Sequence, residues 1–142
     1  MKVFFDASVI IAALLSPNGG SAQLFKYITL KKIIGITSQT VIEEILEEEK
    51  FIKISKSREE IEKFIAGSGL IVRKSVGETD IEKYRYSIDI EDAHLVAGAN
   101  LTKCDYLVSL DQKHVLRQDI KEQFLPLKIV SPGDLLEIIV ST

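Results

Sequence analysis

Lys2-Val3-Phe4-Phe5-Asp6, near the start of the chain, is a short β-prone apolar run that ends in a carboxylate. A run of this length and composition is typical of a buried strand. Four more short apolar runs follow it, and segments of helical pattern separate them. Strands that alternate with helices indicate βαβ crossovers and a parallel sheet covered on both faces. We therefore predict an α/β fold with a central parallel sheet of about five strands.

The expected elements follow from apolar patterns and from residues that start and stop helices. We expect strands at residues 2–5, 33–37, 70–72, 106–109 and 127–130. We expect helices at residues 21–31, 39–50, 57–67, 79–86 and 91–102, and a closing helix from Pro132. Serines open or cap four of these helices: Ser21, Ser38, Ser57 and Ser131. No repeat or Pro/Gly-rich linker interrupts the pattern, so we expect a single domain over residues 1–142.

Composition excludes several classes of protein. The 142 residues are 46% hydrophobic and 27% charged, which are ordinary proportions for a soluble globular protein. One cysteine and two histidines argue against a disulfide framework and against a zinc site. The sequence has no long apolar run or signal peptide, so we predict a cytoplasmic protein without a membrane partner. The net charge of −3 argues against a cationic nucleic-acid-binding chain, but it is compatible with an enzyme that holds a metal ion with carboxylates.

Two aspartates closely follow expected strands, Asp6 at once and Asp111 after Ser109-Leu110. Asp6 follows the first strand, and Asp111 follows the fourth. Open parallel sheets bind their ligands beyond the carboxyl ends of the strands. We therefore expect both side chains at that edge of the sheet, where each could also be an ordinary loop or capping aspartate.

Asp92 lies in the first turn of the expected helix at residues 91–102. At about 100° per residue, it falls near the middle of the face formed by Leu95, Val96 and Ala99, whereas His94 points the other way. Its carboxylate could cap the helix, where the helix dipole favours it, or project into a site at the helix start.

Glu44 belongs to an acidic run at residues 43–49 that is also typical of a solvated helix face. The apolar stripe of this helix consists of Val41, Ile42, Ile45 and Leu46. Glu43 and Glu44 flank that stripe symmetrically, and Phe51 lies on the side of Glu44. We therefore select Glu44 as the residue that faces inward.

These four acids together indicate a site for a hard divalent cation. Mg²⁺ and Mn²⁺ take oxygen ligands, chiefly carboxylates, water and substrate phosphate. An acidic cluster without histidine or cysteine points away from zinc. Such ions activate water and stabilise the charge on a reacting phosphodiester, so cleavage of a phosphate ester suits the arrangement best.

Four segments of the chain resemble the motifs of the PIN domain family. Residues 3–11, VFFDASVII, resemble the opening strand motif. Residues 38–46, SQTVIEEIL, are similar to the second motif, in which a serine or threonine precedes the acid by six positions. Residues 91–99, EDAHLVAGA, and 104–111, CDYLVSLD, resemble the third and fourth motifs run together. The chain especially resembles stand-alone VapC-like proteins, which are classed as toxin components of toxin–antitoxin pairs.

The resemblance implies a three-layer α/β/α fold and a Mg²⁺- or Mn²⁺-dependent endoribonuclease that cleaves single-stranded RNA. It also implies a cognate antitoxin protein as a partner, and a homodimer. It assigns the catalytic and metal-binding roles to Asp6, Glu44, Asp92 and Asp111. Ser8 and Ser109 match small polar positions beside the acids, where their hydroxyls could orient carboxylates or waters.

Some assignments and functions stay open. The family often has two adjacent acids, and here Glu91 precedes Asp92, with Asp89 and Asp119 as substitutes for the ligand. A catalytically inactive PIN-fold binding module and a housekeeping RNA-processing nuclease are the alternative functions. A phosphoacceptor receiver domain is disfavoured, because the chain lacks a paired acid near the first strand and a lysine after the fourth.

Three further features are expected to have no role in the site. His114 lies three residues after Asp111, and we interpret it as a surface histidine. We expect Cys104 to be buried by packing. The basic residues between Lys50 and Arg58 could guide phosphates, but an ordinary solvated surface explains them better.

Overall fold

A computed structural model describes residues 1–47 and 54–142 of the chain. Its strands are β1 (Lys2–Phe5), β2 (Ile34–Ser38), β3 (Ile71–Arg73), β4 (Tyr106–Val108) and β5 (Lys128–Val130). Its helices are α1 (Ala7–Leu15), α2 (Gly20–Thr29), α3 (Gln39–Ile45), α5 (Arg58–Gly67), α6 (Glu78–Glu82), α7 (Ile90–Leu101), α8 (Gln118–Gln123) and α9 (Pro132–Ser141). Each predicted strand is present, with its ends displaced by one residue at most.

The five strands form one sheet in the order β3-β2-β1-β4-β5, and every neighbouring pair is parallel. Phe4 of β1 lies opposite Ile36 of β2 and Leu107 of β4. β1 is therefore the central strand, and its residues 3–5 are fully buried. A parallel strand covered on both faces needs apolar side chains on both, which accounts for the continuous run Val3-Phe4-Phe5.

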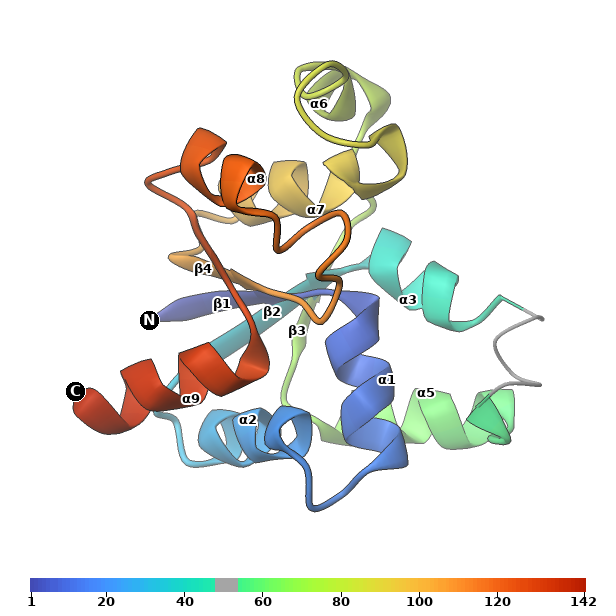
Figure 1. Cartoon of the computed structure of the whole chain (residues 1–142). Helices are drawn as coiled ribbons and strands as arrows, with labels where there is room; N and C mark the ends of the chain where they lie inside the picture. Colours follow the sequence, from blue (N-terminus) through green and yellow to red (C-terminus); the bar gives the residue numbers. More distant parts are fainter. Residues whose placement is uncertain (48–53) are drawn as a thin grey trace.

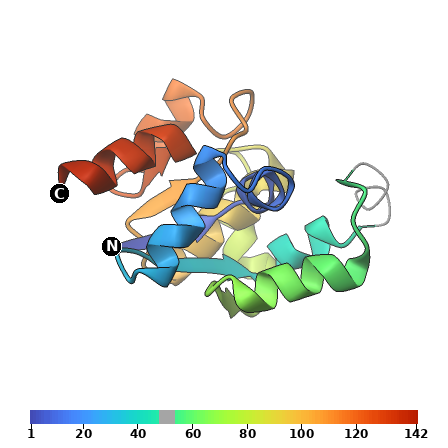
Figure 2. The same ribbon diagram turned by 90° about the horizontal axis from the view of Figure 1, so that it is seen from below.

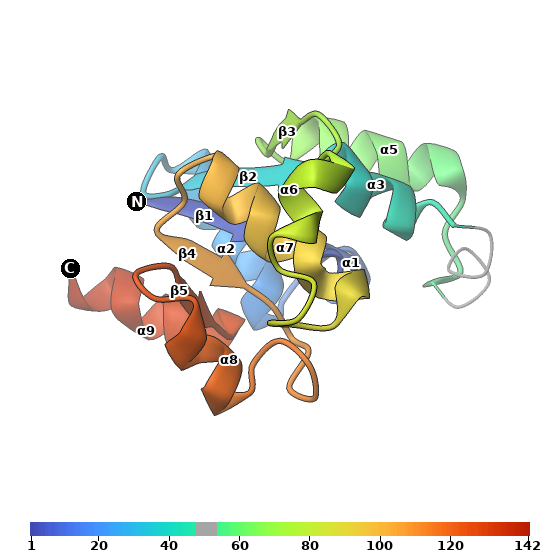
Figure 3. The same cartoon turned by 90° about the horizontal axis from the view of Figure 1, so that it is seen from above.

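Helices cover both faces of the sheet (Figure 1). α6, α7 and α8 lie on one face, as the view from above shows (Figure 3). α1, α2, α5 and α9 lie on the other, as the view from below shows (Figure 2). α3 follows the carboxyl end of β2, at the edge of the sheet where α1 also begins. The predicted α/β fold with three α/β/α layers is confirmed.

α7 packs closely on the central strand at Gly98. A Cβ atom at this position would lie 2.8 Å from Cζ of Phe4, whose ring is fully buried. Real Cβ contacts are longer than this, so the close approach requires glycine. The contact sets the distance between α7 and the sheet, and α7 carries Asp92 in its first turn.

Two helices of the structure, α1 and α8, were not predicted from the sequence. α1 has the sequence ASVIIAALL, which offers no polar face by which its helical period could be read. α8 is short and polar, and Ile120 is its buried residue. Neither shows the amphipathic pattern on which sequence-based prediction of helices depends.

The predicted helix caps are correct in three cases and wrong in one. Ser38, Ser57 and Ser131 accept hydrogen bonds from the backbone of the first helical turn, as expected. Ser21 does not cap its helix, because α2 already begins at Gly20 and Gly19 occupies the cap position. The helix therefore begins two residues before the position that a Ser21 cap would give.

α3 ends at Ile45, earlier than the predicted end near residue 50. Glu47 lies three and four residues after Glu44 and Glu43, and like charges at these spacings disfavour a longer helix. Phe51, whose expected side of the helix favoured Glu44 over Glu43, lies outside the described residues. None of the helices in the described ranges combines the length and apolar character that crossing a bilayer demands.

Candidate active site

Asp6 and Asp111 lie at the carboxyl edge of the sheet, as their positions after β1 and β4 predict. The two strands are neighbours, and the backbone N–H of Asp6 donates to the carbonyl of Val108 at 3.2 Å. The segments that leave β1 and β4 therefore begin side by side. This brings Ser8 and Ser109 to the same place.

The Asp6 carboxylate is held by two serine hydroxyls. Ser109 Oγ donates to Asp6 Oδ2 at 2.7 Å, and Ser8 Oγ donates to the same oxygen at 3.0 Å. The residue is 7% exposed, and burial raises the pKa of Asp6 above its ordinary value, although the two serine hydrogen bonds act against that rise. A buried carboxylate fixed in one orientation can present its other oxygen to a ligand.

The same hydroxyls also accept hydrogen bonds from the loop after β4. The backbone N–H of Leu110 donates to Ser8 Oγ at 3.1 Å, and that of Asp111 donates to Ser109 Oγ at 3.0 Å. Each serine therefore links the loop to Asp6. The two residues predicted as supporting positions lie between Asp6 and the backbone of Asp111.

Asp111 is also held in place by its own loop. Its Oδ1 accepts backbone hydrogen bonds from Lys113 at 3.1 Å and from His114 at 2.9 Å. The alternative reading of Asp111 as a capping aspartate is therefore correct for Oδ1. Oδ2 faces the imidazole of His114, whose Nδ1 lies 3.3 Å away.

Asp92 reaches the site from α7. Its neighbour Glu91 is exposed, whereas Asp92 is half-buried, as expected for the acid on the inward face of the helix. Burial is the main cause that raises the pKa of Asp92 to about 6, and the charges of Asp111, Asp6 and Asp89 add to the rise. Asp92 is thus within electrostatic reach of both sheet-edge aspartates.

Asp92, Asp111 and His114 form a cluster that could hold a metal ion. One ligand atom from each lies within 4.8 Å of the other two. His114 is exposed, as predicted, yet it borders the site, contrary to the expectation that it has no part there. The turn stabilised by Asp111 Oδ1 brings the ring back beside the acids, and spacing in the sequence does not reveal that turn.

Glu44 extends from α3 and contacts a histidine that the sequence placed elsewhere. His94 Nε2 lies 2.5 Å from Glu44 Oε1. The prediction that His94 points away from the buried face is wrong: His94 is 6% exposed, because α7 is packed on more than one side. Glu43 is exposed and Glu44 is partly buried, in agreement with the selection of Glu44.

The two substitute acids have other partners. Asp89 precedes α7 and accepts a hydrogen bond from the backbone N–H of Glu91 at 3.1 Å, so it caps the helix. Asp119 lies on α8 and forms an exposed ion pair with Arg117, which lowers the pKa of Asp119. Neither is among the clustered ligand atoms. Cys104 is buried, as predicted.

The residues at this edge fit a hard divalent cation. The donors are mostly carboxylate oxygens, which Mg²⁺ and Mn²⁺ prefer. Within residues 1–47 and 54–142, no lysine or arginine forms an ion pair with Asp6, Glu44, Asp92 or Asp111. Mutually repelling acids without a lysine or arginine partner are the arrangement that a bound cation stabilises.

Comparisons with known proteins identify the family of the sequence and similar folds. The family model of the PIN domain matches residues 2–113. The fold is similar to that of PAE2754 from Pyrobaculum aerophilum, with a TM-score of 0.64 and 14% identity over 100% of this chain and 97% of that chain. It is also similar to VapBC2 from Rickettsia felis, solved bound to a DNA fragment from its promoter, with a TM-score of 0.61 and 15% identity over 92% of this chain and 98% of that chain. No curated protein matches the sequence.

The two structural likenesses, at such low identity, concern the fold. The match to the family model concerns the sequence itself, and it spans most of the chain, including all four acids. This chain therefore belongs to the PIN domain family, whose members are generally nucleases.

Proposed function

We propose that this protein is an endoribonuclease that requires Mg²⁺ or Mn²⁺ and cleaves single-stranded RNA. The observation that carries the proposal is the gathering of Asp92 and Asp111 beside buried Asp6, with no lysine or arginine of the described ranges paired to them. The chain acts as one nuclease domain. Asp6, Glu44, Asp92 and Asp111 are its catalytic and metal-binding residues.

Each of these residues would have a separate role that depends on its position. Asp92 and Asp111 would hold the ion, and Asp6 and Glu44 would add their carboxylate charges near it. When bound, Mg²⁺ or Mn²⁺ supplies a Lewis acid that activates water and stabilises negative charge on the phosphodiester. Ser8 and Ser109 fix the orientation of the Asp6 carboxylate through Oδ2. Carboxylates that are fixed before the substrate arrives lose little freedom in the reaction.

The biological context we propose is that of a toxin controlled by a cognate antitoxin. The resemblance to VapC-like proteins and the likeness in fold to VapBC2 support this context. A housekeeping RNA-processing nuclease would have the same site. An inactive binding module would not need all four acids, and their presence together at one edge disfavours it.

Cleavage of a mixed pool of single-stranded RNA tests the function. We expect cleavage with Mn²⁺, none in EDTA, and a loss of about a hundredfold or more in Asp92→Asn. Asp119→Asn is the matched control, since it removes the same charge from the exposed pair on α8 and should keep full activity. Unimpaired cleavage in EDTA would refute the metal dependence. RNA binding without any cleavage would support the inactive module.

The family resemblance further supports a homodimer, which is also the commonest soluble assembly. Light scattering should then give twice the 15.9 kDa mass of the chain at micromolar concentration. A species of 15.9 kDa would contradict it.

A further inference from the structure

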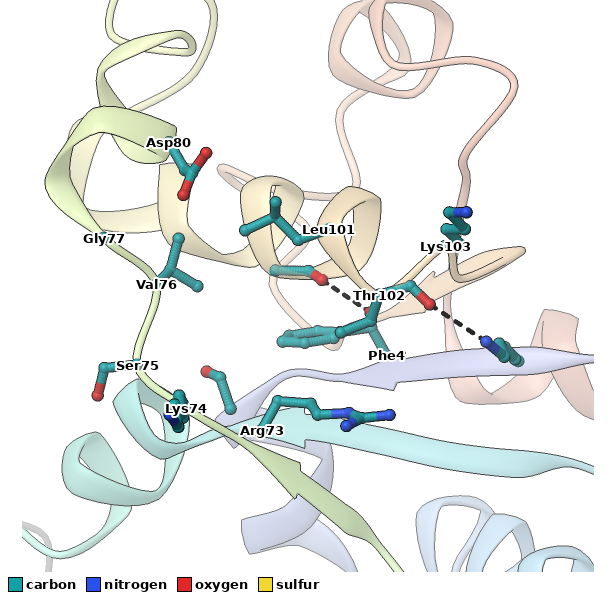
Figure 4. Close-up of a pocket in the computed structure, with 13 residues that line it drawn as sticks. Phe4, Arg73, Lys74, Ser75, Val76, Gly77, Asp80, Leu101, Thr102 and Lys103 are labelled. Atoms are coloured by element: carbon teal, nitrogen blue, oxygen red, sulfur yellow. Dashed lines mark hydrogen bonds between the residues drawn. The ribbon is translucent and has the colours of Figure 1, made fainter.

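A cavity of about 570 Å³ lies on the α7 side of the sheet, apart from the four acids (Figure 4). Its walls come from the carboxyl-terminal half of α7 and from the segment that joins β3 to α6, and Phe4 and Ser38 lie on the sheet side. None of the four acids lines it. It exists because α7 covers the centre of the sheet, whereas β3 is an edge strand whose side chains are exposed.

The cavity is strongly cationic, although the chain has a net charge of −3. Lys2, Arg73, Lys74 and Lys103 line it, against one carboxylate, Asp80. Across the ranges that the structure describes, none of these four cations forms an ion pair, and Asp80 already has Lys83 at 3.7 Å. We call this hollow the cationic cavity.

Apolar side chains also line the cavity, together with the polar residues Ser38, Ser75 and Thr102. Leu101 of α7 is 55% exposed, and Val76 lies opposite it on the β3–α6 segment. Figure 4 shows Arg73 extending along the sheet toward the end of the hollow where Lys103 lies. Cations along a groove, with apolar side chains between them, suit a nucleic-acid strand, whose phosphates are anionic and whose sugars and bases have apolar faces.

The cationic cavity is also placed to receive a strand that leaves the acids. Asp92 and Gly98 both belong to α7, and at 1.5 Å per residue they are about 9 Å apart along its axis. Ser38, which lines the cavity, is also the cap of α3, the helix that carries Glu44. One strand could therefore lie along α7 and contact both places.

We propose that the cationic cavity binds backbone phosphates of the same single-stranded RNA that is cleaved at the acids. This inference rests on the proposed ribonuclease function and adds a second contact site for its substrate. Lys74 makes the charged contact nearest to the β3–α6 segment, Lys2 and Lys103 make those at the other end, and Arg73 extends from the first end toward the second. These contacts position the strand without reading its sequence.

The test measures RNA binding in EDTA, so that binding is scored without cleavage. The probe is a fluorescein-labelled single-stranded RNA of about twelve nucleotides, within the range that such grooves cover. The variant is Arg73→Gln with Lys74→Gln, and both side chains are exposed, so the fold should persist. The control is Lys26→Gln with Lys32→Gln, which removes two exposed charges, one on α2 and one shortly after its end, and neither residue lines the cavity.

Counterion release gives the expected size of the effect. Each phosphate contact on a single strand contributes about 0.7 to the slope of log K against log salt, so loss of two lowers the slope by about 1.4. At about 0.1 M salt this corresponds to roughly 25-fold weaker binding. The control pair should bind as wild type does, and a variant with Arg73→Lys and Lys74→Arg should restore most of the affinity, because phosphate contacts need charge above all.

Each outcome decides one of the two claims. If the Arg73/Lys74 variant binds RNA like the control pair, or if wild type does not bind RNA in EDTA, the cationic cavity is not an RNA site, whether or not cleavage occurs. If binding depends on Arg73 and Lys74 but Mn²⁺ gives no cleavage, the cavity stands and the nuclease fails. If both hold, the variant should raise KM for RNA and leave kcat unchanged, as expected for uniform binding.

Discussion

His94 Nε2 lies 2.5 Å from Glu44 Oε1, and this contact joins α7 to α3 across the candidate active site. Glu44 sits near the end of a helix of seven residues, its side chain is 30% exposed, and His94 is the ion-pair partner of its carboxylate in the described ranges. His94 Nδ1 is buried and has no hydrogen-bond partner among the described residues. Nε2 is therefore the ring nitrogen that has an acceptor, and its N–H donates a hydrogen bond to the Glu44 carboxylate.

Removal of this donor should weaken metal binding without touching a proposed ligand. In His94→Leu, the Glu44 carboxylate loses the contact that orients it, and we expect Mn²⁺ affinity to fall about tenfold, as for other groups that orient ligands. His94→Gln keeps an N–H donor and should bind Mn²⁺ within a few-fold of wild type. Titration calorimetry with Mn²⁺ measures both. If the leucine variant binds Mn²⁺ like wild type, His94 serves packing alone.

The stability of the metal-free protein should fall as the pH rises from about 4 to 6. The pKa of Asp92 is raised from 3.8 to about 6 by burial and by Asp111 and Asp6. Between these values the folded state holds a proton that the unfolded chain has released, so the fold loses stability as the pH rises through this window. Buried Asp6, whose pKa is also raised, acts in the same direction.

Thermal melts across this range give the measurement. Asp92→Asn should reduce the loss of stability with rising pH and should have a higher melting temperature than wild type at pH 7, since it removes the carboxylate charge that Asp111 and Asp6 repel. Asp119→Asn is the control. Arg117 lowers the pKa of Asp119, which is opposite in direction to the shift of Asp92, so removal of the Asp119 charge should not raise the melting temperature at pH 7. If Asp92→Asn melts lower than wild type at pH 7 and keeps the same pH slope, Asp92 acts as a structural cap.

Mn²⁺ should stabilise the wild-type protein at pH 7. A ligand that binds the folded state alone adds about 2.7 kcal/mol at a concentration of about 100 times its dissociation constant. At that same concentration, Asp111→Asn should show a much smaller rise in melting temperature, because it loses a carboxylate of the cluster with Asp92 and His114. An equal rise in both proteins would place the ion elsewhere.

Much of this site was predictable because parallel sheets bring the ends of their strands to one edge. Asp6 and Asp111 each follow an apolar run, so their positions follow from the order of strands alone. The inward direction of Asp92 likewise follows from the period of one helix. These inferences use contacts within an element, or the general geometry of a sheet, and both are encoded locally in the sequence.

His94 and His114 could not be found in this way, because their roles depend on contacts between elements. The helical period gives the face of α7 toward the sheet, but not the approach of α3, which buries His94 from another side. His114 returns to the acids through a turn that the Asp111 carboxylate itself stabilises. α1 is a third example, since an apolar helix without a polar face carries no periodic signal.

Gly98→Ala should destabilise the protein, although alanine favours helices. The better propensity of alanine contributes about 1 kcal/mol in favour of the helix. Against this, the new methyl group would lie 2.8 Å from Cζ of Phe4 and 3.0 Å from its Cε2. The ring is fully buried in the central strand and cannot move aside, and overpacking of this kind costs about 1–3 kcal/mol. We therefore expect a net loss and a lower melting temperature.

Gly67→Ala is the matched control, because a methyl group at this exposed helix position meets no atom within 4 Å and should be neutral or stabilising. Phe4→Leu combined with Gly98→Ala should recover part of the loss, since leucine has no atom at the ring positions that clash, and a double-mutant cycle measures that coupling. The displaced α7 should also carry Asp92 away from Asp111, so Gly98→Ala should bind Mn²⁺ more weakly. If Gly98→Ala instead melts above wild type and binds Mn²⁺ normally, α7 is free to shift on the sheet, and the close approach at Gly98 does not position Asp92.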